Sequence, residues 1–326
     1  MRTPAAGERE RTRRDALQMI EWAIHIQNPQ AVRACDGHLP TVSPQGNGMA
    51  SVHRLALRLI DEYFDSLTIS RVYFGNEFCQ HLIPSLASVR EAYGAARDRG
   101  WGFSLLTPYV TDEGLNKLRP LFEFLEIQDE SVEVIFNDWG VLQQLSSFPH
   151  LKPVHGRLLD KRLRDPRITG LYKSAPISIR TAVQRSNVTT SHYLALLRRY
   201  GVELVELDNV MQGLDMDFRN TPIGAALYIP YGFVATGRVC MIASLHQPQR
   251  ERFRPETRCH HECQHYVTVY TYTRPFGGDG EQRFLLKGNT HFYAHTEEMF
   301  RFVFSRFEHL GIRRFIYQPG LPMWLS

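Results

Sequence analysis

The chain of 326 residues lacks a long apolar segment. Its most apolar stretch, residues 225–244, is interrupted by Pro230, Gly232 and Arg238, so it falls short of the roughly 20 apolar residues that a membrane helix needs. The charged N-terminus has neither the short apolar core nor the small-residue cleavage site of a signal peptide. We therefore expect a protein that neither spans a membrane nor carries a secretion signal.

The chain also lacks a large excess of charge and has few cysteines. Its 38 basic and 34 acidic residues leave a net charge of +4, which does not imply nucleic-acid binding unless the basic residues form one patch. The five cysteines are an odd number, and a chain this long can form a large core without disulfides. We therefore expect a reducing, cytoplasmic environment, in which the cysteines have another role.

Several catalytic signatures are missing from the sequence. It contains no G-x-S-x-G segment and no H-E-x-x-H segment, and no glycine-rich nucleotide turn opens its first helix. The motifs therefore give little support to a serine hydrolase, a zinc peptidase or a dinucleotide-dependent enzyme.

Helix-like and strand-like segments alternate along most of the chain. Segments rich in β-branched and aromatic residues, separated by stretches of helical periodicity, occur at residues 67–74, 102–108, 132–138, 152–159, 202–207, 226–237, 282–293 and 312–318. Such alternation is typical of parallel βα units, and the missing nucleotide turn favours a barrel over an open sheet. We predict an α/β fold of the (β/α) TIM-barrel type, either complete or distorted.

The first 50 residues are predicted to be an N-terminal helical extension. Apolar residues recur at helical spacing over residues 11–27, and residues 38–48 are rich in proline, glycine and serine, as in a linker. We therefore place the barrel domain at residues 51–326.

Four cysteines follow strand-like segments. Cys79 occurs early, Cys240 late, and Cys259 and Cys263 form a C-x3-C pair. In a barrel the loops after the strands meet at one face, so these side chains can converge there. Four thiolates fit either a [4Fe–4S] cluster or a structural zinc ion, and the irregular spacing is more typical of a cluster held by scattered loops. Alternatively the cysteines are buried apolar residues, as we expect for Cys35 in the extension.

The segments around these cysteines resemble a known family. VYFGNEFC, GRVCMIAS and CHHECQHY resemble the cysteine segments of the collagenase-like peptidase family, which includes the ubiquinone-hydroxylation accessory proteins UbiU and UbiV and hydroxylation factors for RNA. VEVIFNDWGVL, PVHGRLLDK and GVELVELDNV resemble further strands of that family in the same order. The resemblance covers roughly residues 67–266, and the UbiV-type pattern of one early and three late cysteines is the closest.

The resemblance implies a cofactor, a reaction and a partner. It implies that Cys79, Cys240, Cys259 and Cys263 hold an oxygen-sensitive [4Fe–4S] cluster. It also implies oxygen-independent hydroxylation, as in ubiquinone biosynthesis or RNA modification, in a heterodimer with a second member of the family. The substrate is then a small molecule or an RNA. The longer gap between Cys240 and Cys259 and the first 50 residues depart from the family pattern.

Two other functions stay open at this point. The family name suggests a peptidase-type hydrolase, although no protease motif is present. The cysteines can instead form a structural zinc site in a non-catalytic scaffold, with four thiolates or with one of His260, His261 and His265 as a ligand. If these histidines bind no metal, we expect them to face solvent.

Acidic and basic residues near the predicted strand ends are further candidates. Glu77 and Asp138 follow strands and can act as acid or base, while Asp138 and Asp208 can instead cap helices. The basic segment 152–167 can bind RNA phosphates or form a solvated helix face.

Overall fold

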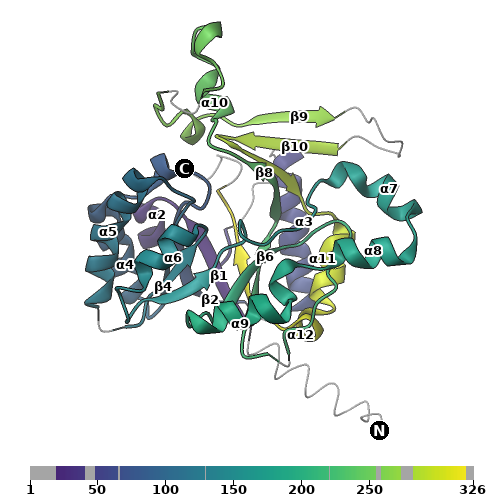
Figure 1. The fold of residues 1–326 in the computed structure, drawn as a ribbon, viewed down its shortest axis with the longest axis horizontal. Helices are drawn as coiled ribbons and strands as arrows, with labels where there is room; N and C mark the ends of the chain where they lie inside the picture. The colour runs from purple at the N-terminus through teal and green to yellow at the C-terminus, as the bar shows by residue number, and fades with distance from the viewer. Residues whose placement is uncertain are drawn as a thin grey trace, which may run out of the picture.

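A closed barrel of parallel strands forms the body of the molecule (Figure 1). The structure is a computed structural model that describes residues 20–40, 48–64, 67–128, 130–219, 221–254, 258–272 and 282–320. The barrel has eight strands, and β1 closes it by pairing with both β2 and β12. In order around the barrel these are β1 (Glu21–Ile26), β2 (Ile69–Gly75), β3 (Gly102–Leu106), β4 (Glu133–Phe136), β5 (Lys152–His155), β6 (Leu204–Asp208), β7 (Gly224–Ile229) and β12 (Ile312–Tyr317). The predicted α/β barrel is therefore confirmed, and it is complete.

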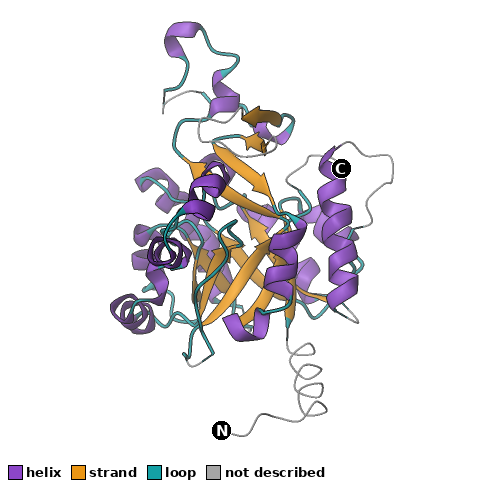
Figure 2. Cartoon of the chain, turned by 90° about the vertical axis from the view of Figure 1, so that its right-hand side faces the viewer, coloured by secondary structure: helices purple, strands orange, loops and turns teal. Residues whose placement is uncertain are grey.

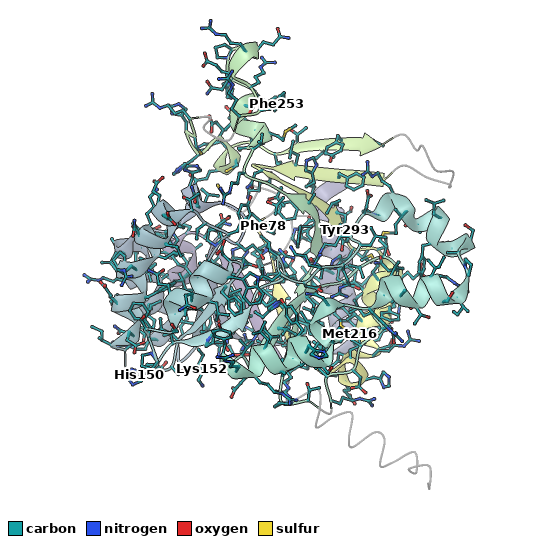
Figure 3. The ribbon with its side chains drawn as sticks, viewed as in Figure 1. Phe78, His150, Lys152, Met216, Phe253 and Tyr293 are labelled. Carbon is teal, nitrogen blue, oxygen red and sulfur yellow. The ribbon has the colours of Figure 1, made fainter. Side chains whose placement is uncertain are left out.

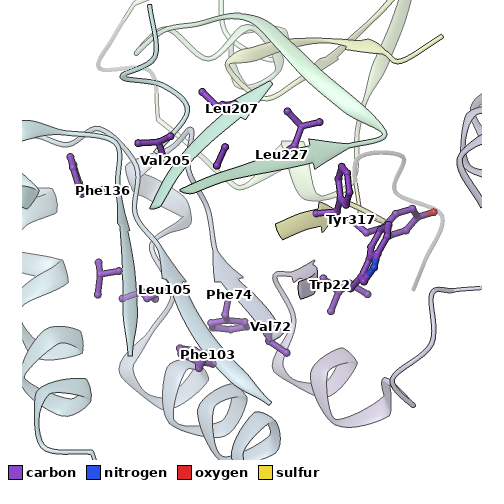
Figure 4. Packing of buried hydrophobic residues seen from close by; sticks show 14 of the residues in the cluster. Trp22, Val72, Phe74, Phe103, Leu105, Phe136, Val205, Leu207, Leu227 and Tyr317 are labelled. Atoms are coloured by element: carbon purple, nitrogen blue, oxygen red, sulfur yellow. The ribbon is translucent and has the colours of Figure 1, made fainter. Parts of the chain in front are cut away.

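Helices surround this barrel and cover its outer face. They are α2 (Pro29–Ala34), α3 (Gly48–Tyr63), α4 (Leu86–Arg97), α5 (Asp112–Glu126), α6 (Trp139–Leu145), α9 (Ser191–Arg199), α11 (Glu297–Phe304) and α12 (Phe307–Leu310). The short helices α7 (Thr169–Ser174) and α8 (Ile177–Gln184) project from the side of the molecule and bury none of their residues (Figure 1). The main core lies between helices and strands and includes Trp22, Phe74 and Phe103 (Figure 4). Within the described residues, no helix is both long enough and apolar enough to cross a membrane.

The first barrel strand lies in the part of the chain predicted to be a helical extension. Residues 21–26 form β1, so the helix predicted over residues 11–27 is wrong there, and residues 11–19 lie outside the described residues. Trp22 and Ile24 face the outer core, whereas Ala23 faces the barrel interior, which is the two-residue alternation of a strand. The predicted domain boundary at residue 50 is therefore wrong, because the barrel already begins at Glu21.

A second sheet is inserted between β7 and β12. Its strands are antiparallel, in the order β8 (Tyr231–Thr236), β11 (Thr290–Ala294), β10 (Gln282–Lys287) and β9 (Thr268–Tyr272). The single strands predicted at 226–237 and 282–293 are each two strands, because Pro230 cannot continue a strand ladder and Gly288 and Asn289 form a turn. We call this unit the added sheet.

The added sheet lies over the carboxyl end of the barrel, as Figures 1 and 2 show. An apolar layer joins the two units, and Phe78, from the loop after β2, lies in it between barrel and added sheet (Figure 3). The ring of Phe78 packs edge-on against Phe233 of β8 and Phe292 of β11. The added sheet is therefore packed on the face where barrel proteins usually have their functional sites.

The amino-terminal end of the barrel interior is a network of ion pairs. Arg314 and Arg71 each contact both Glu21 and Glu133. Burial alone raises the pKa of Glu133, but the two guanidinium groups overcome this effect and lower the pKa to about 2. Functional sites of barrel proteins lie at the opposite, carboxyl end of the strands. These ion pairs therefore have a structural role.

A buried carboxyl group lies farther up the barrel. Glu206 on β6 is fully buried, and Tyr228 donates a hydrogen bond to its Oε2 at 2.9 Å, while Oε1 has no hydrogen-bond partner among the described residues. Burial raises the pKa of Glu206 well above its usual value, and the nearby charge of Glu77 adds to the rise. The group is therefore protonated in the folded protein at pH values where it ionises in the unfolded chain.

We expect the change Glu206→Gln to remove part of the pH dependence of stability. A raised pKa in the folded state gives stability that is present below the unfolded pKa and is lost as pH rises toward the folded pKa. Relative to the variant, wild-type protein is thus expected to lose about 1.4 kcal/mol of unfolding free energy per pH unit in that window. Urea unfolding between pH 5 and 8 measures the difference. The exposed neighbour Glu203→Gln is the control, and parallel pH profiles for wild type and E206Q would contradict the assignment.

Candidate metal centre at the carboxyl end of the barrel

The loop after β2 delivers Cys79 to the carboxyl end of the barrel. Gly75 ends the strand at φ +119°, and a side chain there would approach the carbonyl oxygen of Leu106 to 2.5 Å, so the position requires glycine. The Oδ1 atom of Asn76 then accepts hydrogen bonds from the backbone N–H groups of Phe78 and Cys79, both at 2.9 Å. This Asx turn fixes the direction in which the chain leaves the barrel.

The three late cysteines come from the segment that links β8 to β9. Cys240 precedes the short helix α10 (Met241–Ser244), and its Sγ accepts a hydrogen bond from the backbone N–H of Ala243 at 3.4 Å. Cys263 lies within a short helical turn, Glu262–Gln264, and Cys259 precedes it. His261, directly before this turn, has φ +62° and donates its backbone N–H to Cys259 Sγ at 3.4 Å. A non-glycine residue in this left-handed region is uncommon, and such backbone outliers cluster at functional sites.

The four cysteines lie together in the fold. Each of the six possible pairs among Cys79, Cys240, Cys259 and Cys263 interacts electrostatically, so the early cysteine and the three late ones converge as the sequence predicted. Burial raises the pKa of Cys79 to about 11 and that of Cys263 to about 12, and the neighbouring sulfurs add to both rises. Ionisation of all four thiols would need a cation to offset the repulsion between the thiolates, and a bound metal centre would supply that charge.

Backbone N–H groups point at three of these sulfurs. Besides the contacts of Cys240 and Cys259, backbone hydrogen bonds from His81 and Leu82 lower the pKa of Cys79 against the larger effect of burial. Hydrogen bonds of this type stabilise thiolates and tune the potential of sulfur-ligated clusters. At Cys79 and Cys240 these N–H groups offset part of the pKa rise that burial causes, and they can donate to metal-bound thiolates.

The turn between β10 and β11 ties the cysteine loops together. Asn289 is buried, and its Nδ2 donates to the carbonyl oxygens of Phe78 and Gly237, both at 2.7 Å, which precede Cys79 and Cys240 in the chain. Gly288, at φ +63°, lies against Cys263, whose Sγ would be 3.6 Å from a side-chain carbon there. The sequence does not predict this turn, because Gly288 and Asn289 lie inside residues 282–293, a segment predicted to be one strand.

The histidines beside the cysteine pair face solvent. His260, His261 and His265 are exposed, and among the described residues no group of three or more His, Cys, Asp or Glu side chains is arranged to hold a single metal ion. One zinc ion needs four donors within about 2.3 Å of one point. Among the described residues, the four sulfurs as they stand are therefore not arranged to hold a single metal ion.

Glu77 belongs to a different group of charges, directly below the cysteine loops. The fully buried guanidinium of Arg157 pairs with Glu77 through Nε at 2.9 Å and Nη2 at 2.5 Å, and with Asp208 through Nη1 at 2.7 Å. Burial lowers the pKa of Arg157, but the two carboxylates outweigh this effect and raise it, so the guanidinium stays charged. Arg164 makes a second pair with Asp208, at 3.0 Å.

These contacts decide the roles of the predicted acidic residues. Glu77 and Asp208 hold the centre of the barrel mouth together through Arg157, so Asp208 does not cap a helix, and the turn expected to be helical after it is not a helix. Asp138 caps α6, since its Oδ1 accepts from the backbone N–H of Gly140 at 2.7 Å. Its Oδ2 also accepts a hydrogen bond, from the backbone N–H of Val110 at 3.2 Å. These contacts give Asp138 a structural role.

The basic segment 152–167 is neither a solvated helix face nor a row of free cations. Most of it is a loop after β5, in which Arg157, Arg162 and Arg164 are held in ion pairs with acidic groups. Cys35 lies apart from the four other cysteines, and the groups that act on it are Gly37, Asp36 and Arg99.

The fold and the site together define an α/β-barrel protein with an added antiparallel sheet and a four-cysteine site at the barrel mouth. Comparison with known proteins adds no relative, since no family model matches the chain and no curated protein matches it closely. The resemblance to the collagenase-like peptidase family therefore stays a prediction that depends on the cysteine segments and the order of the strands.

Proposed function

We propose that Cys79, Cys240, Cys259 and Cys263 hold a [4Fe–4S] cluster and that the protein is an iron–sulfur redox protein. The observation that carries this proposal is the convergence of all four thiols at the barrel mouth, with backbone N–H groups directed at their sulfurs. The donor set is all sulfur, which suits soft metal centres. When bound, such a cluster supplies one electron at a time to chemistry beside it.

By its resemblance to collagenase-like peptidase family members, the protein is proposed to support an oxygen-independent hydroxylation in the cytoplasm. In that role it acts with a second member of the family, on a quinone precursor, another small molecule or an RNA. The peptidase alternative is less well supported, because burial raises the thiol pKa values and a cysteine nucleophile needs the opposite shift. A structural zinc site is the competing use of the same four cysteines.

Anaerobic purification followed by metal analysis tests the proposal. We expect about four irons and four sulfides per chain and a broad visible absorption band that bleaches on reduction. Stoichiometric zinc without sulfide would instead support the structural-metal alternative. Protein that was never exposed to air and holds no metal would show that these thiols are ordinary core residues.

A further inference from the structure

A cavity of about 890 Å³ opens beside the cysteine loops. Its walls are the loop after β5, the end of α8 and the second half of β8, together with Tyr109 and Asn137. The volume lies in the range of small-molecule sites, about 300–1,000 Å³. The cavity is at the carboxyl end of the barrel, where such sites occur in this fold.

The lining of this cavity is positively charged. Five basic residues line it and none of the described lining residues is acidic; the basic ones are Lys161, Arg162, Arg164, Arg185 and Arg238. The carboxylates that pair with three of them, Asp160, Asp208 and Asp215, lie outside the lining. A ligand in the cavity therefore faces basic side chains, although the carboxylates that pair with three of them lie behind the cavity wall.

One of these arginines has an unused donor. The side chain of Arg162 is fully buried, and its Nη1 has no hydrogen-bond partner among the described residues. Leaving a donor buried without an acceptor costs free energy, so an anionic ligand that reaches this arginine would recover part of that cost. Arginine binds planar carboxylates and phosphates through paired hydrogen bonds.

Apolar side chains also line the cavity. Leu158, Leu159, Val183 and Phe233 line it, and Arg164 stacks on the ring of Phe233 at 4.5 Å. A site that combines apolar side chains with a few convergent charged groups is typical for an organic molecule that carries an anionic group. A concave site of this size is too small for a nucleic-acid backbone, which needs an open basic surface.

The cavity is joined to the cysteine site through shared residues. Tyr109 lines the cavity, its hydroxyl accepts a hydrogen bond from Asn289 at 3.1 Å, and it interacts electrostatically with Cys79. Thr236 and Gly237, which also line the cavity, lie just before Cys240 in the chain. The cavity and the cysteine loops therefore share Tyr109 and the end of β8.

We propose that this cavity binds a small organic molecule with at least two negative charges, carried by a phosphate group or by two carboxylates. The identification of this molecule as the substrate of the redox centre rests on the proposed function. The binding of the molecule in the cavity does not depend on that function. Tyr109 then stands between the bound molecule and the cysteine site, where it can orient the reacting end of the ligand.

Calorimetric titration of the protein as purified, with its iron measured in the same sample, tests this proposal. The probes are pyrophosphate for the phosphate arm, citrate for the carboxylate arm, and an RNA oligonucleotide. We expect pyrophosphate or citrate to bind, and the double variant Lys161→Gln with Arg238→Gln to weaken that binding at least about tenfold. Both side chains are exposed, so their replacement spares the core.

The matched control removes two positive charges elsewhere, in the double variant Lys117→Gln with Arg219→Gln, and is expected to bind like wild type. Equal weakening in both double variants, no binding of either anion, or binding of RNA that the anions do not displace would each overturn the proposal. Anion binding by protein that contains no iron would leave the cavity assignment intact and count only against the cluster.

Discussion

Replacement of Arg157 by methionine is expected to destabilise the protein by about 3–5 kcal/mol. The change leaves Glu77 without its buried partner and deprives Asp208 of one of its two. Methionine fills most of the space but supplies no donor, so the cost is that of uncompensated buried charge rather than of a cavity. Urea unfolding followed by circular dichroism measures the loss.

This destabilisation should depend on pH in a defined direction. Without Arg157, burial and the nearby charge of Asp208 raise the folded pKa of Glu77 further above the unfolded value. Stability is then lost as pH rises between the two pKa values, so the variant should be closer to wild type at pH 5 than at pH 8. The double variant Arg157→Met with Glu77→Gln should recover part of the loss at pH 8.

An exposed ion pair provides the control for the arginine change. Arg219 pairs with Asp217 at the surface, and the variant Arg219→Met should unfold like wild type. If Arg157→Met were no less stable than Arg219→Met, or if Glu77→Gln made R157M worse at pH 8, the buried network would not hold the barrel mouth together. A variant that fails to fold while the double variant folds would agree with the prediction.

The barrel could be predicted from the sequence because most of its strands and helices have clear local patterns. The buried strand β7 is a continuous apolar run, and α5 carries acidic residues in its first turn and one apolar face. β1 could not be predicted in the same way, since its short alternating segment follows a charged stretch with helical spacing. Only the pairing with β2 and β12, far away in the sequence, makes it a strand.

The cysteines of the candidate site could be predicted from the sequence, whereas the residues that position the cysteine loops could not. A thiol is a rare side chain, so four of them after strand-like segments give a signal without any knowledge of the fold. Arg157 and Asn289 are ordinary residues whose partners lie far away in the sequence: Glu77 is 80 residues from Arg157, and Phe78 is 211 residues from Asn289. Their roles follow from the tertiary structure alone, because no local pattern distinguishes them from surface residues.

The variant Cys240→Ala is expected to lose most of the iron and sulfide that the wild-type protein holds. If the four thiols ligate one cluster, removal of one leaves three ligands, and we expect less than about half of the wild-type iron per chain after anaerobic purification. Cys240 also caps α10 through the hydrogen bond from Ala243, but that helix is only four residues long and its loss alone would not release metal. Iron and sulfide assays with the visible spectrum measure the effect.

Cys35 offers a matched control for this experiment. Its thiol is partly buried like that of Cys240, yet it lies apart from the other four cysteines, so Cys35→Ala should keep the full metal content and spectrum. A Cys240→Ala protein with a complete cluster spectrum would remove Cys240 from the ligand set. Equal loss of iron from C35A and C240A, with unchanged far-ultraviolet circular dichroism in both, would show that the metal is not held where the four sulfurs converge.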